Sequence, residues 1–352
     1  MINKVKYLDN GYLDVRDLIE NGNTFIFGTG GRGTGKTYGA CEYLGEEYEY
    51  SKDNMFIFLR RRETEANTIS TPETSPFLDL TRVKGSKWYK KEPPFVPEVL
   101  ESKTGIIGFR STQTGDICGY LFALSTFYKV KSIPFPRVNI IAYDEFIPMS
   151  GGRKFKDEYK TFNTMYETVN RNRELNGEKP CKFIAMSNSE MLGNPMYLGL
   201  GVVNEALKMQ KNGKDVYNDN SRQLTLAILK DSPISERKAN TALYQLNKNN
   251  AFNTVALKNE FLYDDRLVKS KNLSGYLPVL CVGELIVYRH KSSNEYYVKL
   301  GNNRGVTNYL GTDEDLKRFQ TRETKLLRAY IAQRIYFETY EAQTIFLLYW
   351  DF

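Results

Sequence analysis

The chain reads Gly30-Gly31-Arg32-Gly33-Thr34-Gly35-Lys36-Thr37 close to its amino end. This octet fits the phosphate-binding pattern G-x-x-x-x-G-K-[ST]. An apolar run at 24–27 precedes the octet and a helix-forming segment at 38–44 follows it, so we expect a strand, a glycine-rich turn and a helix. Such a turn aims several backbone N–H groups at one point, where a polyphosphate can bind.

The residue types of the octet suit a magnesium–triphosphate. Its glycines let the backbone approach the phosphates without Cβ clashes. We expect Lys36 to reach the β- and γ-phosphates and the Thr37 hydroxyl to ligate Mg²⁺. The guanidinium of Arg32 could stabilise transition-state charge, pair with the catalytic acid or reach a neighbouring subunit. All eight residues are therefore candidates for nucleotide binding.

A second motif follows an apolar run at 138–143 and consists of the acids Asp144 and Glu145. A buried strand that ends in two acids is the Walker B arrangement. We expect Asp144 to hold the Mg²⁺ shell and Glu145 to activate water for in-line attack on the γ-phosphate. Strand alternation places the two side chains on different faces, which allows separate roles. The glutamate, and the lack of an N-K-x-D guanine signature, favour an ATPase of the additional-strand class, with ATP and Mg²⁺ as cofactors.

Three further polar residues are candidates for catalysis. Asn188 ends an apolar run at 182–186 and is the candidate sensor of the γ-phosphate or of the attacking water; an ordinary polar strand end is the alternative. Arg171 and Arg173 follow a predicted helix at 154–170. From there an arginine finger could reach the ATP of an adjacent subunit, and solvated charges at a helix end are the alternative.

Composition narrows the class of protein. The 352 residues suffice for two domains, and 41% hydrophobic with 26% charged residues is typical of a globular protein. No apolar stretch approaches the roughly 18–20 residues of a membrane span, so we expect a cytosolic protein. Four scattered cysteines and one histidine exclude a locally spaced zinc or iron–sulfur site and make Ser-His-Asp hydrolysis improbable. The net charge of +7 is compatible with a polyanionic partner.

The order of apolar runs predicts an α/β fold. Short runs bounded by turns alternate with helical patterns up to residue 188, which indicates a mostly parallel sheet covered on both faces. We place a P-loop ATPase domain at 1–195, a linker or helical lid at 196–229, and a smaller α+β domain at 230–352. A basic insertion at 70–97, with Trp88 among its lysines, is either a solvated loop or a surface facing nucleic acid.

Three features are expected in the last domain. Strands at 279–288 and 295–300 should form a hairpin, and Thr312 should cap a helix that carries acids in its first turn. The apolar end at 344–350 should be buried in a sheet or an interface.

The octet with its embedded Arg32, together with Ile-Ile-Ala-Tyr-Asp-Glu-Phe-Ile-Pro at 140–148, resembles the DNA-packaging ATPases of viral motors, which are related to phage large terminases. The chain looks most like the packaging ATPases of phi-twenty-nine-like phages. This resemblance implies a homopentameric ring at the portal vertex of an empty capsid in the host cytoplasm, which drives double-stranded DNA inward. It further implies a structural RNA that joins the motor to the capsid.

The resemblance also bears on nuclease activity. The carboxyl-terminal domain of ordinary large terminases is an RNase H-like nuclease, in which acids on adjoining strands bind two metals. Here the candidate first strand at 280–285 carries one acid, Glu284, and no paired carboxylates follow at strand ends. We therefore expect a vestigial, inactive RNase H-like domain that binds nucleic acid or partner proteins.

These observations together predict an ATP-driven translocase that packages double-stranded viral DNA. A helicase or a cellular DNA pump of the same ATPase class is one alternative. The other is a scaffold in which nucleotide orders assembly without being hydrolysed.

Overall fold

The structure is a computed structural model, and the residues it describes form two compact units, Met1–Gly199 with Glu205–Leu262, and Leu200–Asn204 with Tyr263–Phe352. The described residues are 2–50, 53–101, 106–148, 155, 157–230, 232–248, 253, 257, 260–261, 263–303 and 305–350.

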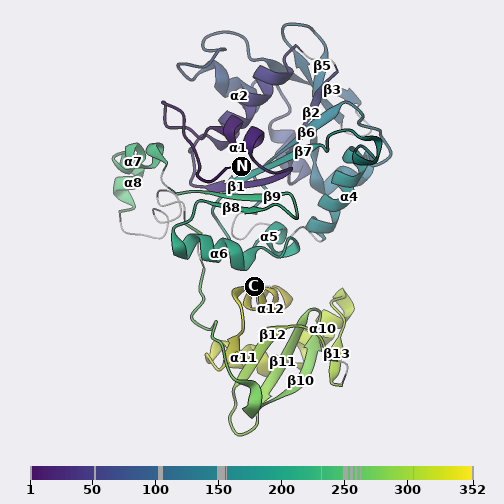
Figure 1. Ribbon diagram of the computed structural model, residues 1–352, viewed down its shortest axis with the longest axis vertical. Helices are drawn as coiled ribbons and strands as arrows, with labels where there is room; N and C mark the ends of the chain where they lie inside the picture. Colours follow the sequence, from purple (N-terminus) through teal and green to yellow (C-terminus); the bar gives the residue numbers. More distant parts are fainter. Residues whose placement is uncertain are drawn as a thin grey trace. The chain divides into compact units, whose positions relative to one another are not determined.

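The first unit is built on a nine-stranded sheet (Figure 1). Its strands are β1 (Phe25–Gly30), β2 (Met55–Arg60), β3 (Phe95–Glu101), β4 (Ile106–Ser111), β5 (Ile117–Ala123), β6 (Val138–Asp144), β7 (Lys182–Asn188), β8 (Val216–Asp219) and β9 (Leu224–Leu229). They lie in the order β3-β4-β5-β2-β6-β7-β1-β9-β8. The strands from β5 to β9 in this order are parallel, and β3, β4 and β8 extend the sheet with antiparallel pairs. The predicted mostly parallel α/β sheet is therefore confirmed.

Strand β7 lies between the strand before the phosphate-binding octet and the strand before the two acids. It pairs in parallel with β1, with Gly30 opposite Asn188, and in parallel with β6, with Asp144 opposite Met186. This is the inserted strand expected of the additional-strand class. Because parallel strands end at one edge, the carboxyl ends of β1, β6 and β7 meet there.

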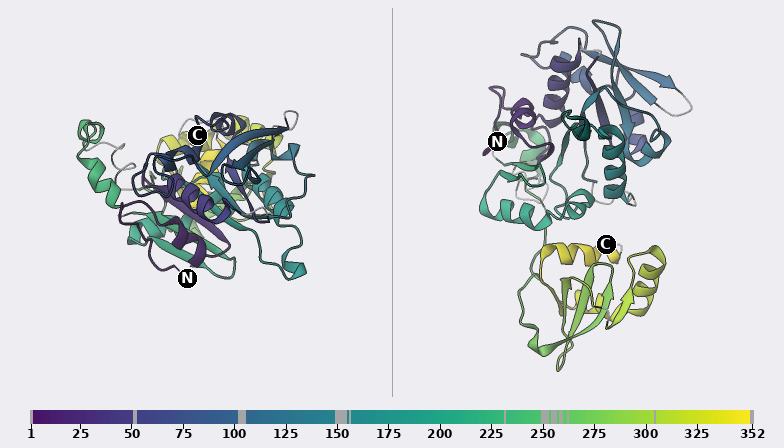
Figure 2. Two further views of the ribbon diagram at one scale, coloured as in Figure 1. Left: turned by 90° about the horizontal axis from the view of Figure 1, so that it is seen from above. Right: turned by 45° about the vertical axis from the view of Figure 1, so that its right-hand side comes forward.

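Helices cover both faces of this sheet, as the burial of its strands requires. The helices are α1 (Val15–Asn21), α2 (Lys36–Tyr48), α3 (Glu63–Thr68), α4 (Glu158–Asn170), α5 (Pro195–Gly199), α6 (Val203–Asn212), α7 (Pro233–Ala239) and α8 (Ala242–Leu246), with short 3₁₀ turns at Pro76–Thr81, Leu124–Lys129 and Glu174–Asn176. Helices α1 and α2 pack in one core with Ile26, Phe56 and Phe58. Helix α4 lies on the other face (Figure 2), where Phe162 packs against Phe183 at 4.8 Å between ring centres.

The structure corrects the predicted domain boundaries. The segment predicted as a linker or lid at 196–229 contains β8 and β9, and β9 pairs with β1 along its whole length. All six residues of β9 are buried. The reason is that residues 224–229 are an apolar run that must be buried. The edge of β1 that does not pair with β7 offers backbone partners to this run. The first unit thus extends well past residue 195.

The second unit holds a mixed five-stranded sheet in the order β13-β10-β11-β12-β14, which confirms an α+β arrangement. Its elements are β10 (Tyr276–Val282), β11 (Leu285–His290), β12 (Tyr296–Leu300), β13 (Thr307–Tyr309), β14 (Ile335–Phe337), α10 (Asp313–Arg322), α11 (Thr324–Ile331), α12 (Tyr340–Tyr349) and a 3₁₀ turn at Leu273–Gly275. The hairpin across 291–294 is confirmed by β11 and β12. The hydroxyl of Thr312 caps α10 by accepting from Asp315 N at 3.4 Å, as expected.

One expectation for this unit is wrong; of the two surroundings predicted for the apolar end, a sheet strand is wrong and an interface stays a prediction. The run at 279–288 is not one strand, because Gly283, at φ +51°, turns the chain between β10 and β11. The apolar end at 344–350 lies mainly in helix α12 rather than in a strand, with Phe346 packed on Phe337 at 5.3 Å between ring centres.

Two general features follow from the packing. All four cysteines are buried with free thiols. In the part of the chain that the structure describes, none of the helices has the length and apolar character that a bilayer crossing requires.

Candidate nucleotide-binding site

The octet at 30–37 forms a turn between β1 and α2. Strand β1 ends at Gly30 and α2 begins at Lys36. Gly33 and Gly35 have φ of +72° and +86°, a backbone conformation that side chains other than glycine rarely adopt. The Thr34 hydroxyl donates to Gly31 O at 3.1 Å and closes the turn. The loop is therefore shaped by its own sequence, as predicted.

Lys36 lies inside this loop. Its ammonium donates to Gly31 O at 2.6 Å, to Gly30 O at 3.2 Å and to Asn188 Oδ1 at 3.3 Å. Burial lowers the pKa of Lys36 to about 7, against the opposing charge of Asp144. A polyphosphate would supply the negative charge that a buried ammonium requires.

Thr37 and Asp144 lie next to each other. The Thr37 hydroxyl donates to Asp144 Oδ1 at 2.8 Å. Burial raises the pKa of Asp144, and Arg60 opposes that rise. A hydroxyl and one carboxylate fit Mg²⁺ held jointly with phosphates and water. The described residues contain no group of three His, Cys, Asp or Glu side chains that could hold a metal by themselves.

Arg60 joins the two acids. It ends β2, and its guanidinium binds Asp144 Oδ2 at 2.6 Å and also forms an ion pair with Glu145. The expectation that strand alternation separates the two carboxylates is wrong. Strand β6 ends at Asp144, and Glu145 has a φ of +58°, so its side chain is not placed by the strand pleat. Both carboxylates therefore reach one guanidinium.

Asn188 is at the end of β7, where the sequence placed the sensor, and its amide oxygen faces Lys36. Arg32 does not pair with either acid of the Walker B motif. Its guanidinium binds Glu190 at 3.2 Å and is about half exposed, 49%. The structure therefore does not show the alternative in which Arg32 pairs with the catalytic acid Glu145.

Arg171 and Arg173 lie apart from these residues. Arg173 donates to Pro136 O at 2.9 Å and lines a separate cavity of about 500 Å³, next to the first residues of β6 and β7. Arg171 is exposed and donates to Thr168 O at 3.3 Å. Neither lines the cavity at the octet. A role in the site of their own chain is therefore not supported, and a role toward a neighbouring subunit stays a prediction.

Five residues of the octet, both acids and Asn188 border one cavity of about 840 Å³; the five are Arg32, Gly33, Gly35, Lys36 and Thr37. The cavity is also lined by residues that the sequence analysis did not single out, including Tyr12, Arg61, Arg62 and Glu65. Tyr12 packs on Tyr38 at 5.1 Å between ring centres, and the neighbouring Leu13 N donates to Thr34 O at 3.0 Å. No local pattern marks Tyr12, because it enters the site only through the fold.

Arg60 and Arg61 could have been found from the sequence. They follow the apolar run at 55–59, and the carboxyl end of a parallel strand lies at the same edge as the octet. Arg61 is 3% exposed in its side chain and binds the buried Glu158, which also accepts from Tyr143 at 3.1 Å. This buried pair fixes the start of α4 beside β2.

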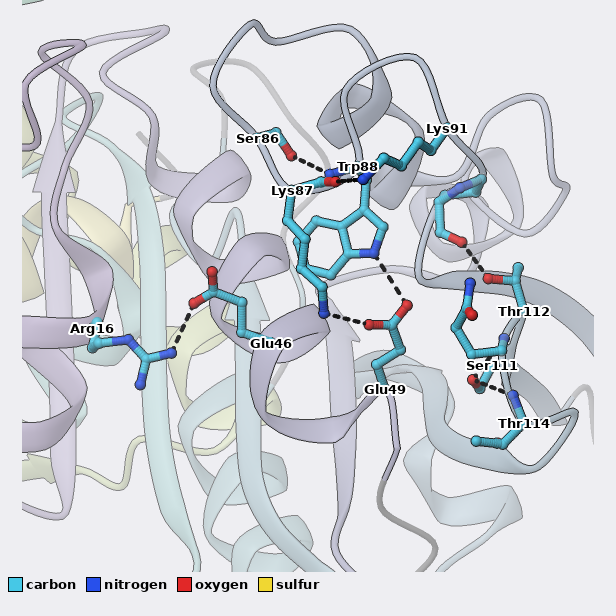
Figure 3. Close-up of polar contacts among 12 residues, drawn as sticks. Arg16, Glu46, Glu49, Ser86, Lys87, Trp88, Lys91, Ser111, Thr112 and Thr114 are labelled. Carbon is cyan, nitrogen blue, oxygen red and sulfur yellow. Dashed lines mark hydrogen bonds and ion pairs between the residues drawn. The ribbon is translucent and has the colours of Figure 1, made fainter.

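The basic insertion is anchored on helix α2 (Figure 3). The indole N–H of Trp88 donates to Glu49 Oε1 at 3.1 Å, and Lys87 binds the same carboxylate at 2.9 Å. Trp88 is 3% exposed, and a Cβ at Gly45 would lie 2.6 Å from its ring. Trp88 is thus a packing residue and cannot stack on a base, although Lys84, Lys90 and Lys91 in the same segment are exposed.

Comparison with known proteins identifies the family. Residues 96–283, more than half of the chain, match the family model described as Podovirus DNA encapsidation protein (Gp16). The DNA packaging protein of Bacillus phage phi29 is 25% identical over 248 residues, which are 70% of this chain and 64% of that protein. The DNA packaging protein of Bacillus phage B103 is 24% identical over 250 residues, 70% of this chain and 68% of that protein. The match therefore spans less than two thirds of the length of the phi29 protein.

Two solved structures share the fold over nearly the whole chain. The structure of the Phi-28 gp11 DNA packaging motor aligns with a TM-score of 0.65 at 18% identity, over 97% of this chain and 98% of that one. The bacteriophage Phi-29 viral genome packaging motor assembly aligns with the same TM-score and coverage at 16% identity. The matched family region contains both acids and Asn188, and this chain belongs to the Podovirus DNA encapsidation protein (Gp16) family.

Proposed function

We propose that this chain is the ATPase subunit of a motor that drives double-stranded DNA into a viral capsid. The observation that carries this proposal is the convergence of the glycine-rich loop, the acids at the end of β6 and Asn188 on one cavity. An unrelated glycine-rich turn would not bring these groups together, since they come from three strands.

Each residue of the cavity has a role in this proposal. The loop N–H groups and Lys36 bind the β- and γ-phosphates. Thr37 and Asp144 ligate Mg²⁺, which when bound neutralises phosphate oxygens. Glu145 orients and deprotonates the attacking water. For this step its carboxylate must leave the Arg60 guanidinium and contact the water instead. Asn188 senses the terminal phosphate from β7.

The nucleoside end has a candidate wall in Tyr12 and Tyr38. Their rings pack together at the cavity, and Tyr12 lies against the octet at Gly35. An adenine ring gains contact energy from an aromatic face without needing polar partners of its own. We therefore assign the base to this side of the cavity.

Work on DNA requires neighbouring subunits, and we propose a ring at the capsid portal. The family and the two motor assemblies with the same fold support this assignment. In such a ring an exposed arginine of one subunit would act on the ATP of the next. Arg171 suits that role better than Arg173, because Arg171 is exposed, with one bond from its Nε to Thr168 O, whereas Arg173 is half-buried and a terminal nitrogen of its guanidinium donates to Phe135 O and Pro136 O. Basic side chains would hold DNA phosphates without sequence preference, and a structural RNA joining ring to capsid belongs to the same proposal.

The test is phosphate release by the purified chain with and without duplex DNA, followed by packaging. We expect DNA-stimulated release from wild type and protection of added duplex DNA from nuclease when emptied capsids and ATP are present. Glu145→Gln is the matched control, because it keeps the shape of the site and removes the base. Nucleotide binding without any hydrolysis would support a scaffold instead, and strand separation on a forked duplex would support a helicase.

A further inference from the structure

Helix α7 brings a second lysine to the phosphate loop. This helix follows β9 in the chain, and the Lys238 ammonium donates a hydrogen bond to the carbonyl oxygen of Arg32. A Cβ at Gly33 would overlap the Lys238 ammonium, so the contact depends on a glycine at that position of the loop. Lys238 is half-buried.

Other contacts hold α7 in this place. Arg237 donates to Asn10 O at 3.2 Å, and a Cβ at Gly11 would lie 3.2 Å from Pro233. The end of the helix is fixed by Thr241 N, which donates to Lys238 O at 2.8 Å. Helices α7 and α8 project from the side of the first unit (Figures 1 and 2). The position of Lys238 is therefore set by α7 rather than by a flexible side chain alone.

The charge of Lys238 acts on the phosphate loop. Burial lowers the pKa of Lys238 itself. Among the charged neighbours of Lys36, Asp144 and Glu145 favour its ammonium form, whereas Lys238 and Arg32 oppose it. In the described part of the chain, no carboxylate forms an ion pair with Lys238. The ammonium thus adds uncompensated positive charge next to a loop shaped for a polyanion.

We propose that Lys238 is a positioning residue of the nucleotide site: it fixes the phosphate loop through the Arg32 carbonyl and couples helix α7 to polyphosphate binding. This inference rests on the proposed function, because it presumes that the loop binds a nucleoside triphosphate. It assigns a functional role to α7, which lies beyond the strand, loop and helix of the phosphate-binding motif.

The experiment compares the affinity of fluorescent MANT-ATP for the full-length wild type, Lys238→Met, Lys238→Arg and the control Lys248→Met, at low and high salt. Lys248 is an exposed lysine at the end of α8, so its loss changes net charge equally. We expect Lys238→Met to weaken binding on the order of tenfold at 50 mM KCl, the size of one charge-assisted hydrogen bond. The deficit should shrink to a few-fold at 1 M KCl, because salt screens the charge. Lys238→Arg should restore most of the affinity, and Lys248→Met should match wild type.

Three outcomes would overturn the inference and leave the proposed function standing. Equal affinity of Lys238→Met and wild type at both salt concentrations would remove any role for this lysine. A deficit that does not depend on salt and that arginine does not restore would show damage to α7 instead of a lost cation. An equal loss in Lys248→Met would show an effect of net charge alone. Failure of the wild type to bind MANT-ATP would refute the proposed function, and the inference with it.

Discussion

Replacement of Arg60 by methionine should destabilise the first unit and should do so more strongly at neutral than at acidic pH. The Arg60 side chain is 12% exposed and Asp144 is 9% exposed, so their ion pair is buried, whereas Glu145 is 51% exposed. Methionine fills most of the volume of the arginine stem but leaves Asp144 without its cationic partner. The perturbation therefore tests electrostatics more than packing.

The magnitude follows from burial. Breaking a buried ion pair by removing one partner costs about 3–5 kcal/mol, because a charge remains uncompensated. The exposed contact to Glu145 adds no more than about 1 kcal/mol. The Thr37 hydroxyl still donates to Asp144, which keeps the expected loss near the low end, at about 3 kcal/mol at pH 7.5.

The pH dependence has a definite sign. Burial already raises the pKa of Asp144 in the folded chain, and removal of Arg60 raises it further. A folded-state pKa above the unfolded value gives stability that is present at low pH and lost as pH rises through the folded pKa. The destabilisation by Arg60→Met should therefore be smaller at pH 5 than at pH 7.5.

The assay is urea denaturation followed by tryptophan fluorescence. The chain has two tryptophans, so a Trp350→Phe background leaves Trp88 of the first unit as the only reporter. The control is Arg82→Met, an arginine of the same cavity wall whose pair with Asp79 is 67% exposed on both sides. Its effect should stay within about 0.5 kcal/mol. Unchanged stability of Arg60→Met at pH 7.5, or a loss that grows toward pH 5, would refute the reasoning.

Three further predictions concern the nucleotide. Glu145→Gln should keep MANT-ATP binding and reduce DNA-stimulated phosphate release about 10²-fold or more, the usual contribution of a general base; undiminished turnover would contradict that role. Because burial lowers the pKa of Lys36 to about 7, it is mostly neutral at pH 8, and binding of ATP in EDTA should take up close to one proton there and almost none at pH 6. Calorimetry in buffers of different ionisation enthalpy measures this uptake, and equal uptake at both pH values would exclude Lys36 as its source. Gly35→Ala should abolish ATP binding, because φ is +86° and the new methyl would meet Tyr12. Gly213→Ala, at φ +69° with open space around it, should bind ATP normally and lose only about 1 kcal/mol of stability, and equal binding losses in both variants would argue against a specific role of the loop.

The parts of the site that were predicted correctly are those encoded over short distances. The glycines and Lys36 of the octet shape a loop that needs only its own strand and helix. Asp144 and Asn188 end apolar runs, and parallel strands that end at one edge bring such residues together wherever the strands lie in the sheet. The additional strand could be inferred for the same reason.

The errors involve residues whose surroundings come from distant segments. Glu145 was placed by strand alternation, but the strand ends one residue earlier and Arg60 draws both acids to one point. The run at 224–229 looks like part of a connection until the free edge of β1 is available to pair with it. The turn at Gly283 is visible only when the backbone angle is known.

The sequence by itself determined that a glycine-rich loop, a pair of acids and a strand ending in Asn188 exist, because each is a local pattern with a fixed backbone requirement. Only the tertiary structure decided which partners the accompanying cations have. Arg60 and Lys238 come from β2 and α7, more than twenty and two hundred residues from the octet, and side chains so far apart in the chain acquire their partners through packing alone.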